Sequence, residues 1–148
     1  MDKLKVFQQC LAVVESNISA IKLALKEAQD AANNETKSTA GDKHETGRAM
    51  AQLETEKLSA QLNEALKMGQ AINQLNPKQQ TEQVLLGSLV TTNKGNFYVA
   101  ISLGKIEVEG KACYIISPVS PIGKILLTKK EKDSFSLNGT HYVIEKIL

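Results

Sequence analysis

The first long segment of the chain, residues 4–32, reads LKVFQQCLAVVESNISAIKLALKEAQDAA. Its apolar side chains recur in alternating steps of three and four, and no Pro or Gly interrupts them. This is the a/d heptad pattern of a coiled coil, so we predict one long helix with an apolar seam. The seam consists of Leu4, Phe7, Leu11, Val14, Ile18, Ile21, Leu25, Ala28 and Ala32.

A second helix is predicted after a polar break. Residues 33–41, NNETKSTAG, favour a turn because their side chains compete for backbone hydrogen bonds or, for Gly, permit positive φ. Helical spacing resumes after Asp42 and stops at Asn76, because the following Pro disfavours helix at that residue. The second seam consists of Ala51, Thr55, Leu58, Leu62, Ala65, Gly69 and Ile72, whereas Leu53 and Leu66 lie off it.

Residues 1–76 are therefore predicted to form an antiparallel two-helix hairpin, a coiled-coil arm about 45 Å long. Such an arm has a free end, which suits a protein that reaches into a partner. A dimerisation coil, in which the same seams pair between chains, fits the periodicity equally well.

Residues 81–148 read as a small antiparallel β domain with one short helix, which makes the fold class α+β. Asn138-Gly139 between two strand-like runs is a strong hairpin signal. Ser120 is a good N-cap and Pro121 fits the first position of a short helix. The expected strands are residues 84–91, 97–102, 106–108, 112–117, 134–137 and 141–147.

The composition argues against a general nucleic-acid-binding protein and against a membrane protein. The 148 residues are 42% hydrophobic and 23% charged with a net charge of +2, which is too small for wholesale binding of nucleic acid. No run approaches the ~18 apolar residues of a membrane helix, and the N-terminus lacks a signal-peptide core, so we expect a soluble cytoplasmic protein. We assign Cys10 and Cys113 to different domains and expect no disulfide.

Chemistry-bearing residues gather at the predicted loop. Asp42 and Glu45 have the spacing of a capping box, in which both side chains bind backbone N–H groups at a helix start. Arg48, the only arginine, either pairs with Glu45 or contacts a phosphate. Lys43 and His44 fit solvated loop residues, and a metal site on His44 would need further His or Cys nearby.

Three segments resemble the Gre family of transcript-cleavage (transcription elongation) factors. Residues 117–130, SPVSPIGKILLTKK, resemble that family's Ser-Pro-Ile motif, which opens a short helix in an FKBP-like domain. Residues 84–90, VLLGSLV, resemble the first strand of the same domain. Residues 41–45, GDKHE, resemble the family's acidic tip, Gly-Asp-x-x-Glu, and the order of all three segments agrees.

The resemblance implies an accessory factor, itself not an enzyme, that binds RNA polymerase through the secondary channel and stimulates hydrolysis of backtracked RNA. Asp42 and Glu45 would help hold a second Mg²⁺ shared with the polymerase, and the free protein would bind none. Arg48 and Lys43 would contact the nascent RNA 3′ end. The docking residues would be Ser120, Pro121 and Ile122, although Ile122 also fits a core position.

Other readings stay open. The family's tip Glu is usually followed by Asn and then an aromatic residue, whereas here Thr46, Gly47 and Arg48 follow. A non-cleaving regulator of the same channel is therefore the second expectation, and a structural coiled-coil adaptor is the third. A prolyl isomerase is disfavoured because the domain has few aromatic residues for an apolar pocket. We expect a monomer without a membrane partner.

Overall fold

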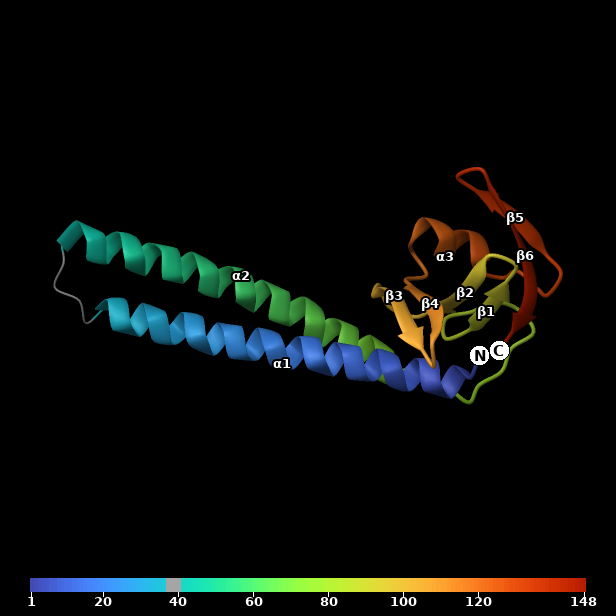
Figure 1. Cartoon of the computed structure of the whole chain (residues 1–148), viewed down its shortest axis with the longest axis horizontal. Coiled ribbons are helices and arrows are strands. Elements are labelled where there is room, and N and C mark those ends of the chain that lie inside the picture. Colours follow the sequence, from blue (N-terminus) through green and yellow to red (C-terminus); the bar gives the residue numbers. More distant parts are fainter. Residues whose placement is uncertain (37–40) are drawn as a thin grey trace. The chain divides into compact units, whose positions relative to one another are not determined.

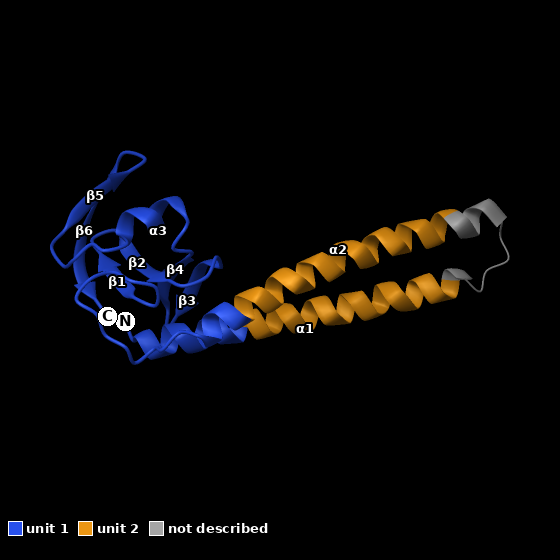
Figure 2. Ribbon diagram, turned by 180° about the vertical axis from the view of Figure 1, so that it is seen from behind, with its two compact units in different colours: residues 1–12, 70–148 blue, residues 13–69 orange. Residues whose placement is uncertain are grey.

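The computed structural model describes residues 1–34 and 46–148 with their side chains, and residues 35, 36 and 41–45 only as helical backbone; residues 37–40 are not described. The chain divides into two compact units (Figure 2). One unit contains residues 13–69, and the other contains residues 1–12 together with residues 70–148.

The unit of residues 13–69 is a helical hairpin. Its two helices, α1 (Lys3–Thr36) and α2 (Gly41–Asn73), run side by side in opposite directions (Figure 1). Val14 on α1 and Leu58 on α2 are buried. A Cβ atom at Gly69 would lie 3.6 Å from the side chains of Val14 and Ile18, so the backbone of α2 lies close to α1 at this point.

The seams predicted from the periodicity are confirmed along most of the hairpin. From Leu11 to Ala32 every predicted seam position of α1 is buried or half-buried. The same holds on α2 from Ala51 to Ile72, while Leu53 and Leu66, which lie off the predicted seam, are exposed. The two seams are therefore covered within one chain.

The start of α1 differs from the prediction. Leu4 is 38% exposed, whereas Val6 and Cys10 are fully buried. These turns belong to the unit that holds the sheet, and a face of the helix other than the predicted seam is buried there. Cys10 and Cys113 consequently lie in the same unit, contrary to the assignment to different domains, and both are free thiols.

The second unit is built on a six-stranded sheet of order β3-β4-β2-β1-β6-β5. All neighbouring pairs are antiparallel except one, which confirms the predicted α+β class. The strands are β1 (Leu89–Thr92), β2 (Gly95–Val99), β3 (Gly104–Val108), β4 (Lys111–Ile116), β5 (Ser134–Leu137) and β6 (Thr140–Ile147).

The exception is the pair β2–β4, which is parallel with Phe97 opposite Tyr114. The hairpin β3–β4 places β3 at the edge of the sheet and returns β4 beside β2 in the same direction. Residues 84–88 also differ from the expected strand, because Gly87 adopts φ +92° and turns the chain before β1 begins. Val84 instead exchanges backbone hydrogen bonds with residues 128 and 129.

The core of the sheet unit combines strand residues with the short helix α3 (Pro121–Leu126). Leu126 is fully buried in it, and Ile122 and Ile125 pack against it, so Ile122 has the core position that its sequence also fitted. Asn138 and Gly139 have φ values of 51° and 80°, which confirms the predicted turn of the β5–β6 hairpin. In the described part of the chain no helix could span a lipid bilayer.

Candidate functional site

The acidic pair falls largely outside the described residues. The backbone of Asp42, Lys43 and Glu45 belongs to the first turns of α2, but their side chains are not described. Both the capping box and the Mg²⁺ role therefore stay predictions. Within residues 1–34 and 46–148, no three His, Cys, Asp or Glu side chains gather closely enough to hold a metal ion.

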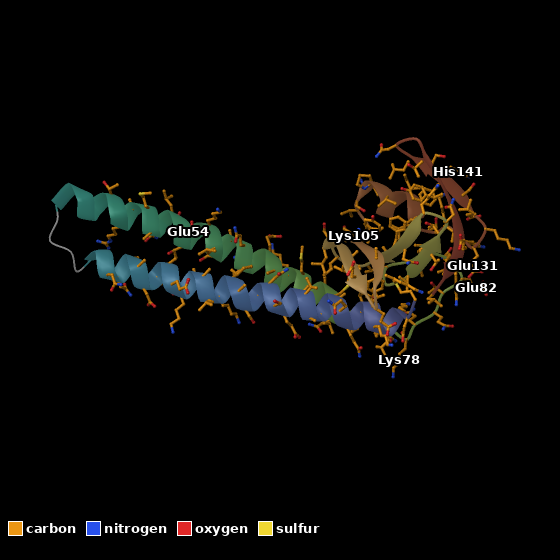
Figure 3. All side chains as sticks on the ribbon, in the orientation of Figure 1. Glu54, Lys78, Glu82, Lys105, Glu131 and His141 are labelled. Carbon is orange, nitrogen blue, oxygen red and sulfur yellow. The ribbon has the colours of Figure 1, made fainter. Side chains whose placement is uncertain are left out.

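Arg48 is the one predicted tip residue whose side chain is described, and it is exposed on α2. The side chain at position 45 lies outside the described residues. Pairing of Arg48 with Glu45 and contact of Arg48 with a phosphate therefore both stay predictions. Farther along the same helix, Glu54 also lies at the surface (Figure 3). The described part of α2 thus presents charged side chains to solvent while its seam faces α1.

The segment before α3 is held by a compact set of hydrogen bonds around Ser120. The Ser120 hydroxyl donates to the carbonyl oxygen of Ser117 at 2.6 Å and accepts from the Gly123 N–H at 3.1 Å. The Ser117 hydroxyl in turn accepts from the N–H of Val119 at 3.2 Å. Ser120 therefore caps the helix, as the sequence predicted.

Gly123 allows this segment to lie against α3. A Cβ atom at position 123 would stand 2.1 Å from the carbonyl oxygen of Ser117 and 2.8 Å from the hydroxyl of Ser120. Only glycine fits this spacing without movement of the backbone. The segment is thus pre-organised before any partner binds.

The three residues predicted to dock on a partner occupy different environments. Pro121 is exposed, Ser120 is half-buried, and Ile122 packs against the core. Their docking role stays a prediction. Val119, which directly precedes them within the surface of residues 118–126 predicted from the sequence, is 73% exposed.

The loop that follows α3 carries exposed side chains of both charges. The carboxylate of Asp133 accepts from the backbone N–H of Lys130 at 2.8 Å, and that of Glu131 accepts from the N–H of Ile147 at 3.1 Å. Both acids thus bind backbone groups, and the side chains of Lys130 and Lys132 are exposed in the same loop.

Two thiols and a phenol are buried in the sheet unit. Burial, reinforced by the proximity of Cys113, raises the pKa of Cys10 to about 12. Burial likewise raises the pKa of Cys113 to about 12, and it raises the pKa of Tyr98 as well. The Tyr98 hydroxyl has no hydrogen-bond partner among the described residues. Since thiolates are the nucleophilic form, these thiols are unreactive at neutral pH.

Comparison with solved structures gives a similarity of the whole chain to a known protein. Neither a known protein family nor a curated protein matches the sequence. Among solved structures, the chain is similar to one described as "Structure of the transcription factor Gfh1", with 17% sequence identity and a TM-score of 0.38. The alignment covers 93% of this chain and 92% of that one.

Proposed function

We propose that this protein is an accessory factor of RNA polymerase that enters the secondary channel with its helical hairpin and stimulates hydrolysis of backtracked RNA. The observation that carries the proposal is the position of the Gly-Asp-x-x-Glu segment. Residues 41–45 begin α2, a helix of 33 residues that runs antiparallel to α1, a helix of 34 residues ending at Thr36. Acidic residues at this end of the hairpin belong to the part that can reach farthest into a partner.

The donor set suits magnesium. Mg²⁺ prefers oxygen ligands, keeps several waters and takes one or two carboxylates besides substrate phosphate. Positions 42 and 45 are neighbours on a helix because they are three residues apart. A second Mg²⁺, when bound, would stabilise the attacking and leaving oxygens of the phosphodiester. In this proposal Asp42 and Glu45 hold the ion from one side and orient water, while Arg48 and Lys43 contact phosphates of the RNA 3′ segment.

The sheet unit would provide the surface that binds the polymerase. Ser120 and Gly123 hold the segment before α3 in one conformation, so little conformational entropy is lost on binding. Val119 and Pro121 are exposed there as apolar contacts. The exposed lysines after α3 would favour an acidic stretch of the polymerase.

A backtracked elongation complex carrying labelled RNA tests the proposal. The double variant Asp42→Ala with Glu45→Ala should bind polymerase like the parent chain and lose stimulated cleavage. The matched control is Glu54→Ala with Glu56→Ala, which removes two exposed carboxylates from the same helix and should cleave normally. Undiminished cleavage by the tip variant would refute the Mg²⁺ role.

A second candidate is a non-cleaving regulator of the same channel, because Thr46 and Gly47 replace the residues that usually follow the tip glutamate. This candidate predicts no RNA shortening by the parent chain, together with competition against a cleavage factor for polymerase. The adaptor candidate is weakened because both seams are covered within one chain. Sedimentation at micromolar concentration tests the adaptor candidate, and a stable dimer would support that candidate.

A further inference from the structure

The first residue of helix α1, Lys3, carries a largely buried positive charge. Lys3 is only 8% exposed, and its ammonium group donates a hydrogen bond to the carbonyl oxygen of Gln79 at 2.5 Å. Among the described residues no carboxylate lies within ion-pair distance of Lys3; Lys5, in contrast, pairs with Glu109. The acid beside it, Asp2, accepts from the backbone N–H of Leu4.

This buried cation is electrostatically unfavourable as it stands. Burial lowers the pKa of Lys3, because the charged form loses hydration. A cation in the first turn of α1 also opposes the helix dipole, whose positive end lies there. A neutral carbonyl partner offsets only part of this cost, whereas an anion would offset more of it.

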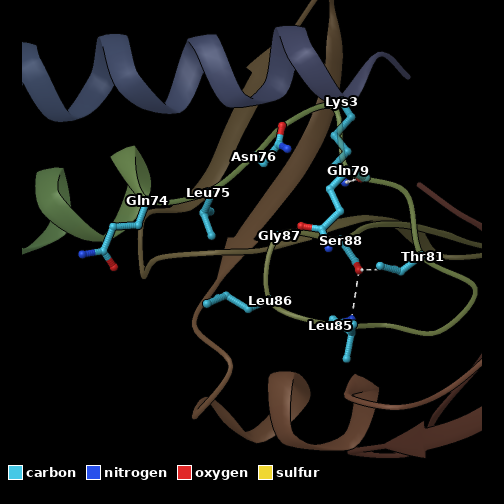
Figure 4. Close-up of a pocket in the computed structure, with 10 residues that line it drawn as sticks. All are labelled: Lys3, Gln74, Leu75, Asn76, Gln79, Thr81, Leu85, Leu86, Gly87 and Ser88. Carbon is cyan, nitrogen blue, oxygen red and sulfur yellow. Dashed lines mark hydrogen bonds between the residues drawn. The ribbon is translucent and has the colours of Figure 1, made fainter.

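Lys3 lines a hollow of about 240 Å³ within the sheet unit (Figure 4). Pockets for drug-sized ligands measure ~300–1,000 Å³, so this one fits a smaller molecule or group. Leu75, Leu85 and Leu86 supply apolar walls, and the last two are also partly exposed at the surface.

The polar groups of the hollow differ in what they can still bind. The Ser88 hydroxyl accepts from the N–H of Leu85 and contacts the hydroxyl of Thr81, which itself donates to a backbone carbonyl. These hydroxyls are therefore occupied. An ammonium has three donors, and Lys3 uses one on Gln79, so the others remain. Asn76 accepts from the N–H of Lys78 with its Oδ1, which leaves its amide N–H groups as donors.

We propose that this hollow binds a carboxylate group carried on a small apolar stem. The carboxylate would accept from Lys3 and Asn76, and the stem would lie on the leucine walls. Such a group belongs either to a small organic acid or to the C-terminal residue of a peptide. The proposal goes beyond the polymerase function and does not depend on it.

Titration of the ¹⁵N-labelled full chain with sodium isobutyrate, observed in amide NMR spectra, tests the site. The amides of Gly87 and Ser88 should shift saturably, and isobutyramide, which lacks the charge, should leave them in place. N-acetylleucine represents the C-terminal residue of a peptide, and isobutyrate represents a small organic acid. Tighter binding of N-acetylleucine identifies a peptide C-terminus as the ligand, and weaker binding identifies a small organic acid. Absence of saturable shifts, or equal shifts with isobutyramide, refutes the proposal without any variant.

Substitutions then test whether Lys3 is the residue that binds the carboxylate. Lys3→Met should weaken isobutyrate binding at least about tenfold, whereas Lys94→Met, which removes an exposed lysine of the same unit, should leave it unchanged. Asn76→Ala keeps Lys3 intact and should weaken binding by a smaller factor. Retention of full affinity in a folded Lys3→Met chain would overturn the assignment of Lys3.

Discussion

The carbonyl oxygen of Ser117 lies only 2.1 Å from the position that a Cβ atom at Gly123 would occupy. The segment that the proposed function uses for docking is therefore built around a glycine whose role is steric.

Gly123→Ala should destabilise the sheet unit by at least about 1–3 kcal/mol, the usual range for overpacking. The added methyl group meets backbone and not a flexible side chain, so relief requires movement of the Ser117 carbonyl or of α3. Chemical denaturation monitored by circular dichroism measures the change. An unfolding free energy equal to that of the parent chain would contradict the close approach.

Gly69→Ala is the matched counterpart in the hairpin and should act in the opposite direction. Its Cβ atom would make ordinary contacts at 3.6 Å with Val14 and Ile18. Alanine is favoured over glycine inside a helix by roughly 0.5–1 kcal/mol. Thermal unfolding should show increased stability of the hairpin, and a loss of stability would show that the helices are too close for a methyl group.

Val119→Asp should leave folding intact and weaken the proposed polymerase binding. The side chain is 73% exposed, so a surface substitution should change the unfolding free energy by no more than about 0.5 kcal/mol. If Val119 is an apolar contact, a buried and unpaired carboxylate in its place should weaken binding about tenfold or more. Val119→Ile is the control and should bind normally. Unchanged affinity of the Asp variant would remove Val119 from the interface.

The buried thiols should make stability fall at alkaline pH. The folded chain holds the Cys10 and Cys113 protons up to about pH 12, whereas unfolded thiols ionise around 9.0. Between these values the unfolded chain binds fewer protons, so the free energy of unfolding decreases as pH rises, and below about pH 9 the thiols leave it unchanged.

Urea denaturation at several pH values measures this slope, expected at roughly 1.4 kcal/mol per pH unit for each thiol. Cys10→Ala lowers stability at every pH by creating a cavity, but its pH slope should be shallower than that of the parent chain. Equal slopes would show that Cys10 ionises normally in the folded protein.

Local patterns predicted the elements whose partners lie nearby in sequence. The seam positions of both helices, the Ser120 cap and the Asn138-Gly139 turn follow from periodicity, side-chain hydrogen bonding and backbone sterics. The order of acidic tip and Ser-Pro segment could likewise be read directly. The exposed position of Val119 could be suspected only after its flanking turn was recognised.

The chain order and spacing of residues by themselves determined a two-helix seam, an α+β class and candidate residues at two places, because these depend on contacts between near neighbours. Only the tertiary structure decided that β2 and β4 run parallel, that Val6 and Cys10 replace Leu4 on the buried face, and that Lys3 meets Gln79. Those features depend on contacts between segments that are far apart in sequence, and no local period encodes which face a distant segment will cover.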